Sequence, residues 1–175
     1  MIPSRTAQRA PRAFTLVEML VVLAIVAILG GLILTGVNAA RKRSQINQTQ
    51  LIITQLEQNL ENYASDFSEY PPSEGDDGVK GNERMIEALS TEDKNGPYIL
   101  KKEFHFSDAN HNGLKEVLDA WGKPIHYIHH KDYDRTPPNK RTFRLFSAGP
   151  DGRLDPLDPQ SDDVVNWNKA EADEQ

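Results

Sequence analysis

The 175-residue sequence contains no cysteine, which excludes disulfide bonds and thiolate metal ligands. An exported domain normally has disulfides available, so an exported domain in this chain must be stabilised by other means or by assembly. The sequence also lacks a Gly-x-Ser-x-Gly motif and a phosphate-binding glycine-rich loop. Its acids cluster in loops without an evident nucleophile. These absences predict a protein that is not an enzyme.

Charge is missing from a long stretch near the amino terminus. After Glu18, no charged residue occurs before Arg41, and Leu16–Val37 is interrupted by appreciably polar residues only at Glu18 and Thr35. A helix of about 20 apolar residues crosses a bilayer core, whereas an ordinary secretory signal has an apolar core of about 7 to 15 residues. The stretch therefore predicts a single membrane-spanning helix that is retained.

Glu18 is a costly residue in such a helix. An ionisable side chain at the centre of a spanning helix costs roughly 2.5 to 3.5 kcal/mol, and less near an end. Two interpretations remain open at this point. The carboxylate is either tolerated at the interface or has a function.

The first 13 residues contain no acid and have three arginines, Arg5, Arg9 and Arg12. We expect them to form a cytoplasmic leader. Residues 41–43 place three further basic side chains beyond the apolar stretch, so flanking charge alone leaves the orientation open.

The next segment has an apolar residue every three or four positions, which is the helical period. No glycine or proline occurs between Val37 and Tyr70, and Pro71-Pro72 follows. We therefore predict one helix from Phe14 to about Phe67. Its buried stripe comprises Ile46, Thr49, Ile53, Leu56, Leu60, Tyr63 and Phe67.

The remainder of the chain predicts short elements and many turns. Residues 73–78 are turn-forming, and Arg84–Leu89 favours a short helix. Two later runs, Pro124–His130 and Thr142–Ser147, are typical of strands. A small antiparallel sheet packed on the long helix, and hence an α+β fold, follows.

These patterns divide the chain into four segments. Residues 1–13 form the leader and residues 14–37 the transmembrane and assembly helix. Residues 38–70 form an amphipathic helical spine, and residues 71–175 form a globular head.

A late loop is rich in aspartate. Asp151, Asp155, Asp158, Asp162 and Asp163 share it with glycine and proline residues. These hard oxygen ligands favour calcium. The alternative is a solvated acidic loop.

A second loop matches the start of a calcium-loop pattern. Oxygen-bearing side chains alternate and are followed by a glycine, and the predicted ligands are Asp108, Asn110, Asn112, the Leu114 carbonyl, Glu116 through water, and Asp119. Asparagine replaces two acids, and asparagine-rich turns form without metal. In the alternative interpretation, Asp119 bonds the nearby backbone instead.

Histidines at positions 126, 129 and 130 raise the question of zinc. Neighbouring side chains on a strand point to opposite faces, and no cysteine assists. We therefore do not predict a zinc site.

The basic leader, followed by Ala13-Phe14-Thr15-Leu16-Val17-Glu18 and an apolar run, resembles the class III signal of type IV prepilins and type II secretion pseudopilins. The resemblance implies cleavage between Ala13 and Phe14 and N-methylation of Phe14. It also implies that Glu18 pairs with the terminal amine of a neighbouring subunit during assembly. Two residues depart from the pattern: Ala13 stands where glycine is usual, and Thr35 replaces a common proline.

Later motifs resemble the major pseudopilin family of type II secretion, with its pilin-like fold. They are Asp119-Ala120-Trp121-Gly122-Lys123-Pro124, residues 146–152 and residues 163–167. The resemblance implies a calcium-ordered C-terminal loop. Its ligands would be the Ala148 carbonyl and the side chains of Asp151 and Asp163, with Asp162 adjacent to them.

The resemblance also implies a function. The chain would be a structural subunit that polymerises into a periplasmic fibre and drives protein export. Its partners would be copies of itself, minor pseudopilins, prepilin peptidase, the inner-membrane assembly platform and membrane lipid. The head would lie in the periplasm on a single-pass anchor in the cytoplasmic membrane.

Nucleic acid is not an expected partner. Acids outnumber bases by 26 to 20, and removing the leader arginines changes the formal net charge from -6 to -9. Two alternatives stay open: a subunit of a type IV pilus or DNA-uptake pseudopilus, and a membrane-anchored enzyme whose aspartates hold a catalytic metal.

Overall fold

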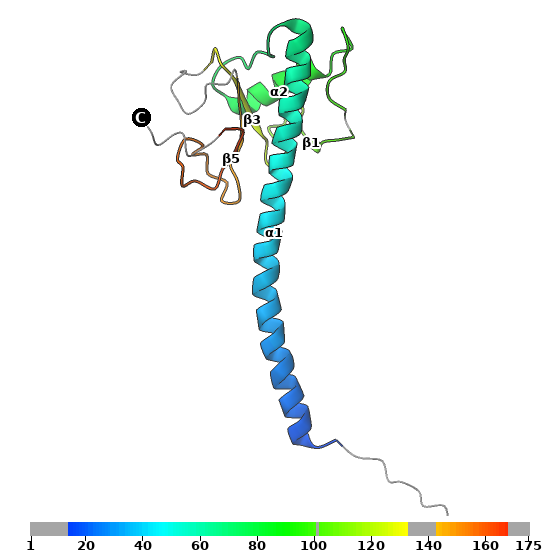
Figure 1. The fold of residues 1–175 in the computed structure, drawn as a ribbon, viewed down its shortest axis with the longest axis vertical. Helices are drawn as coiled ribbons and strands as arrows, with labels where there is room; N and C mark the ends of the chain where they lie inside the picture. The colour runs from blue at the N-terminus through cyan, green and yellow to red at the C-terminus, as the bar shows by residue number, and fades with distance from the viewer. Residues whose placement is uncertain (1–13, 101, 133–142, 168–175) are drawn as a thin grey trace, which may run out of the picture. The chain divides into compact units, whose positions relative to one another are not determined.

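The computed structural model describes residues 14–100, 102–132 and 143–167, with the side chains of residues 32–36 left out. The chain divides into two compact units, Met1–Arg41 and Lys42–Gln175. One helix, α1, runs through Leu16–Phe67 and confirms the predicted long amino-terminal helix (Figure 1). Thr142, at the start of a predicted strand, lies outside the described residues, as does Ala13.

α1 ends as the sequence predicts. Ser68 takes a left-handed conformation, with φ of 60°, and its N–H donates to the Ala64 carbonyl at 2.8 Å. A left-handed residue after the last turn is a common helix stop. Proline cannot continue the helix, and Pro71-Pro72 follows.

In the second unit, the predicted stripe of α1 is buried along its middle, whereas Ile46, Tyr63 and Phe67 at its ends are half-buried. Ile53, Leu56 and Leu60 are fully buried, together with Thr49. The Thr49 hydroxyl accepts a hydrogen bond from the Ala120 N–H at 3.2 Å, so its polar atom has a partner. This stripe forms one wall of the core of the head.

The short helix α2 spans Gly78–Leu89 and is longer than predicted. Asp77 caps it, because the Asp77 carboxylate accepts from the N–H groups of Val79 and Lys80 at 3.0 and 3.3 Å. The prediction that the turn continued to residue 78 was therefore wrong at its end. Gly78 was assigned to the turn, whereas it is the first residue of the helix and Asp77 is its N-cap.

Two small antiparallel sheets complete the head. The first pairs β1, Phe106–Ser107, with β2, Glu116–Val117. The second has the order β3-β4-β5, formed by His126–His129, Phe143–Ser147 and Val164–Val165. Both predicted strands are confirmed in shortened form, and the α+β, pilin-like class is confirmed. β1, β2 and β5 were not predicted, because two residues are too few to show an alternating pattern.

Buried polar side chains join these elements. Asn82 of α2 donates to the Val117 carbonyl and accepts from the Val117 N–H, both at 3.0 Å. Asn166 accepts from the Leu145 N–H at 3.0 Å and donates to Glu57 of α1 at 3.0 Å. Satisfied buried polar groups fix one packing arrangement. In a chain without cysteine, such bonds fasten the late segments to the helix.

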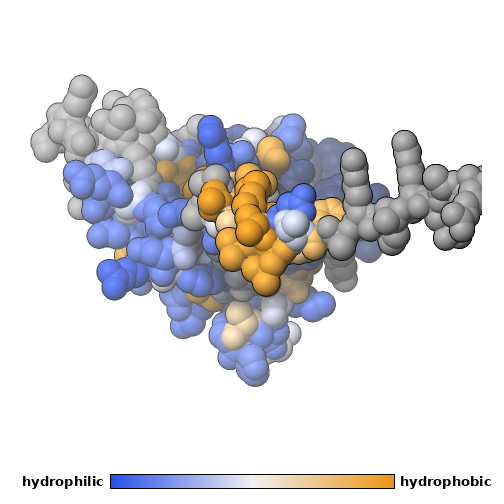
Figure 2. Space-filling model, turned by 90° about the horizontal axis from the view of Figure 1, so that it is seen from below, coloured by the Kyte–Doolittle hydropathy of each residue, from blue (hydrophilic) through white to orange (hydrophobic). Residues whose placement is uncertain are grey.

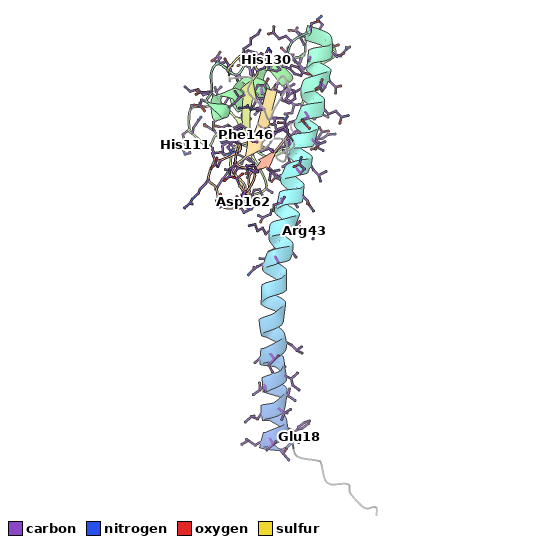
Figure 3. All side chains as sticks on the ribbon, turned by 60° about the vertical axis from the view of Figure 1, so that its left-hand side comes forward. Glu18, Arg43, His111, His130, Phe146 and Asp162 are labelled. Atoms are coloured by element: carbon purple, nitrogen blue, oxygen red, sulfur yellow. The ribbon has the colours of Figure 1, made fainter. Side chains whose placement is uncertain are left out.

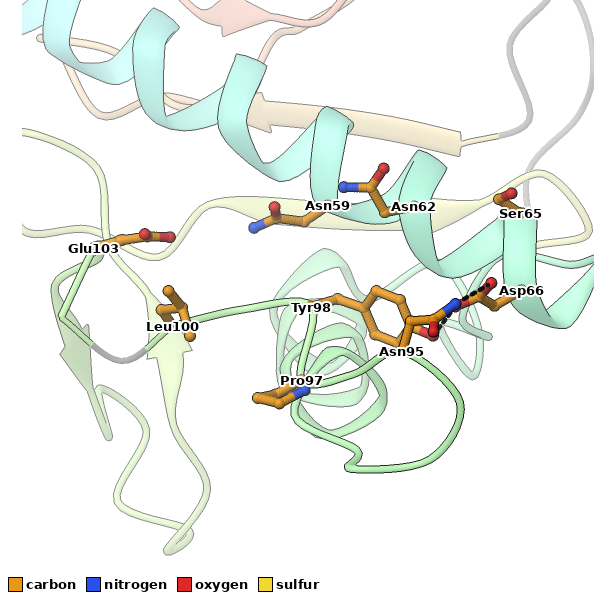
Figure 4. A pocket seen from close by; sticks show the side chains of 9 residues that line it. All are labelled: Asn59, Asn62, Ser65, Asp66, Asn95, Pro97, Tyr98, Leu100 and Glu103. Carbon is orange, nitrogen blue, oxygen red and sulfur yellow. Dashed lines mark hydrogen bonds between the residues drawn. The ribbon is translucent and has the colours of Figure 1, made fainter.

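Asp66, near the carboxyl-terminal end of α1, accepts a further group of hydrogen bonds. The Asp66 carboxylate accepts from Asn95 Nδ2 at 3.1 and 3.0 Å, and the Tyr98 hydroxyl also donates to it (Figure 4). These bonds hold the pKa of Asp66 below its usual value, with the Tyr98 bond as the largest cause. The loop after α2 is thus tied to the end of the spine.

Candidate assembly and metal-binding sites

The first turn of α1 holds a reciprocal cap at the proposed assembly residue. Both the N–H and the hydroxyl of Thr15 donate to Glu18 Oε2 at 2.9 Å, and the Glu18 N–H donates to the Thr15 hydroxyl at 3.3 Å. This is a capping box of the Thr-x-x-Glu type. Glu18 therefore has a local role in starting the helix, which was not predicted although the spacing signals it.

The residues that follow expose large apolar side chains. In Leu16–Leu29, these side chains are 45 to 80% exposed, and Phe14 is 74% exposed. Figure 2 shows them in orange, viewed from the amino-terminal end of α1. Among the side chains that the structure describes, no helical segment meets the length and apolarity needed to span a bilayer. An apolar surface of this extent marks a region of association.

The C-terminal acidic loop brings Asp162 beside residues of the turn at positions 148–152. Asp162 is labelled in Figure 3. Its Oδ1 is buried and has no hydrogen-bond partner, while its Oδ2 lies 3.7 Å from Lys42 Nζ. A Cβ on Gly149 would lie 2.3 Å from the Asp162 carbonyl oxygen and 3.1 Å from Asp162 Oδ1. Gly149, with φ of 58°, is therefore required for this close approach.

The other predicted ligands of this loop differ in their surroundings. Asp163 is buried and accepts from the Asp155 N–H at 2.8 Å. Asp151 is exposed and accepts from the Arg153 N–H at 2.8 Å. The Ala148 carbonyl accepts from the Gly152 N–H at 3.1 Å.

Asp163 is thus the buried aspartate of the set, whereas the Asp162 side chain is 30% exposed and only its Oδ1 is buried. A buried carboxylate oxygen without a donor, such as Asp162 Oδ1, is the kind of atom that a cation satisfies. The oxygen-only donor set also suits calcium. A lysine contributes positive charge nearby, because the Lys123 ammonium occupies the space over Gly152.

The Asp108 loop closes the β1-β2 hairpin and is internally hydrogen-bonded. Asp108 Oδ1 and Oδ2 accept from the N–H groups of Asn112 and Gly113, both at 2.9 Å. Asn112 Oδ1 accepts from the Leu114 N–H at 2.8 Å, and Glu116 Oε2 accepts from the Ala109 N–H at 2.9 Å. Most of the predicted set, comprising Asp108, Asn110, Asn112, Leu114 and Glu116, lies within this one hairpin.

Asp119 is the exception. Its Oδ1 accepts from the N–H groups of Trp121 and Lys123 at 2.8 and 2.9 Å, and its Oδ2 accepts from the Ser147 hydroxyl at 2.6 Å. The structure therefore favours the alternative that Asp119 bonds nearby backbone. The Asp-x-Trp-Gly motif is a turn that Asp119 holds against β4.

Histidines and other metal-binding side chains form no cluster in the described part of the chain. No group of three or more histidine, aspartate or glutamate side chains is placed there to hold a metal ion by itself. The His126 ring stacks on Phe146 at 5.0 Å, and burial lowers the pKa of His126. The expectation that neighbouring histidines point apart was wrong for His129 and His130, whose rings are 4.1 Å apart because His130 follows the end of β3.

Two family models of known proteins match this chain, one at its amino-terminal end and one over the rest. Residues 8–34 match the family model of the prokaryotic N-terminal methylation motif. Residues 37–167 match that of type II secretion system protein G, which covers most of the chain. The chain belongs to the type II secretion system protein G family.

Similar curated proteins agree with the assignment to the protein G family. The chain is 27% identical over 163 residues to type II secretion system core protein G of Dickeya chrysanthemi, covering 92% of this chain and 89% of that protein. It is 27% identical to the Escherichia coli K12 protein of the same name, covering 89% and 90%. The Pseudomonas aeruginosa protein G is 26% identical, with 92% and 98% covered.

The structure of this protein G family member also adds a residue that was not predicted from the sequence. Glu83 of α2 is buried, and it accepts from Asn110 Nδ2 and Asn112 Nδ2 at 2.6 and 2.8 Å. It lies 27 positions before Asn110 in the sequence. No local pattern could therefore connect Glu83 with the loop.

Proposed function

We propose that the chain is a structural subunit of a type II secretion pseudopilus and has no catalytic role. Prepilin peptidase would cut it between Ala13 and Phe14, and Phe14 would be N-methylated. Residues 14–37 would cross the cytoplasmic membrane once, with the head in the periplasm. Copies of the chain would polymerise with minor pseudopilins on the inner-membrane assembly platform.

One observation carries this proposal. A methylation-type processing signal at residues 8–34 is followed almost directly by a protein G segment at residues 37–167. The exposed apolar side chains of Leu16–Leu29 support it, because lipid in the membrane or neighbouring helices in a fibre would cover them. The fibre would then push secreted proteins through an outer-membrane channel.

Assembly depends in this proposal on Phe14 and Glu18. The free amine of Phe14 would pair with Glu18 of an adjacent copy, which compensates for burying the carboxylate among apolar side chains. The intramolecular cap at Thr15 occupies Glu18 Oε2. A carboxylate has about four lone-pair sites, so Glu18 can serve the cap and a neighbour together.

Calcium is the proposed cofactor of the C-terminal loop. Asp162, Asp163 and Asp151 would supply side-chain oxygens, and Ala148 its carbonyl. The buried Oδ1 of Asp162, which lacks a hydrogen-bond partner, supports this assignment. The ion would neutralise the carboxylates and keep the loop closed against the head.

The test of the function is deletion of the gene in the organism that carries it, with secretion and DNA uptake measured together. We expect exported enzymes to accumulate in the periplasm and DNA uptake to be unchanged. Mass spectrometry of the membrane-bound protein should show a chain that begins at N-methylated Phe14. Normal secretion with lost DNA uptake would contradict the proposal, as would an intact Met1 terminus in cells with active prepilin peptidase.

A further inference from the structure

Two buried carboxylates lie where α2 meets the β1-β2 hairpin. Glu116 is fully buried and Glu83 is 7% exposed. No ion pair between described residues includes either of them. Removing a carboxylate from water costs several kcal/mol unless opposite charge or donors compensate for it.

Only one of the two carboxylate oxygens of Glu116 has a hydrogen-bond donor. Its Oε2 accepts from the Ala109 N–H at 2.9 Å, whereas its Oε1 is buried and has no hydrogen-bond partner. Ala109 is the second residue of the hairpin loop. The Glu116 carboxylate is therefore held at the base of that loop, with one oxygen available.

Glu83 reaches the same loop from α2. Its Oε1 accepts from the side-chain amides of both Asn110 and Asn112, at 2.6 and 2.8 Å. A half-turn of each amide would put an Oδ1 in the place of its Nδ2. It would also give up the bonds that Asn110 Oδ1 and Asn112 Oδ1 accept from the Asn112 and Leu114 N–H groups, at 3.1 and 2.8 Å, for which a bound cation would have to compensate. The loop can then present amide oxygens toward the carboxylate of Glu83.

We propose that this junction is a calcium site formed by Asp108, Asn110, Asn112 and Glu116 of the hairpin with Glu83 of α2. Three carboxylates and two amides provide hard oxygen ligands on a loop that can adjust to 6 to 8 contacts. No three acidic or histidine side chains among the described residues are already placed to hold a metal ion, so the asparagine oxygens would have to complete the set. Glu83 would supply the last carboxylate ligand, the role that the sequence pattern assigned to Asp119.

The site would have a structural role distinct from that of the C-terminal loop. It would join a helix to a hairpin whose strands have only two residues each. So short a hairpin is marginally stable by itself. A divalent ion would here do what a disulfide does in many exported domains.

The test is calcium titration calorimetry of the full chain in detergent micelles, after removal of bound metal. The starting protein should carry Asp162→Ala, which removes a proposed ligand of the other loop. One binding event should remain, and Glu83→Gln or Glu116→Gln should weaken it by more than about tenfold, the loss that even an outer-shell partner can cause. Glu87→Gln, on the same helix with an exposed carboxylate, is the matched control and should bind as the starting protein does.

Asn112→Asp separates a metal site from a hydrogen bond, and circular dichroism verifies that the variant folds. If Asn112 is a ligand, the added charge should increase calcium affinity, and calcium should raise the melting temperature more than in the parent. If Asn112 only donates to Glu83, the variant should be destabilised without rescue by calcium, which would overturn the proposal. Unchanged calcium binding in both Glu83→Gln and Glu116→Gln would also overturn it, and would leave the secretion function untouched.

Discussion

The two parts of α1 differ in what covers their apolar side chains. In Leu16–Leu29, the large apolar side chains are 45 to 80% exposed, whereas Ile53, Leu56 and Leu60 in the second part are fully buried. Both parts are helical and rich in leucine and isoleucine, so propensity does not explain the difference. The apolar side chains of the second part are buried by the head of the same chain. The first requires lipid or other copies, and this division is what a polymerising subunit needs.

The largest effect that would test this comparison concerns core packing. Leu56→Ala should lower the free energy of unfolding of the head by about 2 to 5 kcal/mol, because it leaves a cavity in a packed core. Leu23→Ala, at a side chain 68% exposed, should change it by less than about 0.5 kcal/mol. Denaturant unfolding of the full chain in detergent, followed by tryptophan fluorescence, measures both. Equal losses would break the comparison.

Calcium should act on the head only. With free calcium at 100 times its dissociation constant, binding stabilises by about 2.7 kcal/mol, so chelation should lower the melting temperature of the head. Asp162→Ala should remove most of the part of this response that is due to the C-terminal loop. Asp158→Ala should not, because Asp158 lies outside the proposed ligand set and its side chain accepts from the Gln160 N–H. An equal response in both variants would contradict the proposed ligand set.

Substitutions of Glu18 should affect assembly and leave the head unchanged. Glutamine can keep the capping box with Thr15 while removing the charge, whereas alanine removes both. A bond to a charged partner contributes about 1.5 to 3 kcal/mol, so both variants should assemble about tenfold less or worse. Introduced cysteine pairs in a chain that otherwise has none give a direct cross-linking measure of fibre yield. Normal assembly of Glu18→Gln would show that the residue acts through the cap alone.

The smallest effect should come from acidification, again confined to the head. Burial lowers the pKa of His126, which stacks on Phe146 and faces Asp77 and Asp119. The folded head therefore binds fewer protons than the unfolded chain, and stability falls as the pH drops below about 6.5. Unfolding curves between pH 7.5 and 5.5 measure the loss, and His126→Gln should reduce it. His111→Gln, at an exposed position of the head, is the control for removing one histidine.

Carboxylates produce a separate loss at lower pH. Hydrogen bonds and nearby cations hold the pKa values of Asp66, Glu69 and Asp132 below their ordinary values. Their contribution to stability is present above the unfolded pKa, at about 4, and is lost as the pH falls below it. The two ranges are far enough apart to be resolved in one titration.

The sequence predicted those elements whose apolar pattern repeats over many residues. The stripe from Ile46 to Phe67 specified a helix and its buried face, and Pro71 its end. Residues 124–130 and 142–147 alternated over enough positions to identify β3 and β4. The two-residue strands β1, β2 and β5 form because tertiary partners align them, and no local pattern reports such partners.

The candidate sites follow the same rule. The Asp108 loop and the Asp162 loop were found because their oxygen ligands are close together in sequence. For Asp119 the sequence left two interpretations open, a calcium ligand or a bond to nearby backbone, and the hydrogen bonds from the Trp121 and Lys123 N–H groups favour the second. Glu83 could not be found, because only folding brings α2 to the hairpin.

The cap at Thr15 has a consequence for maturation. The first α1 hydrogen bond between described residues runs from the Met19 N–H to the Thr15 carbonyl, and Phe14 and Thr15 are not helical. Cleavage on the amino side of Phe14 would therefore fall before the first helical hydrogen bond between described residues. Trimming would cost the helix none of these bonds. The same rod would exist before and after the cut, and only its charge and its new amine would change.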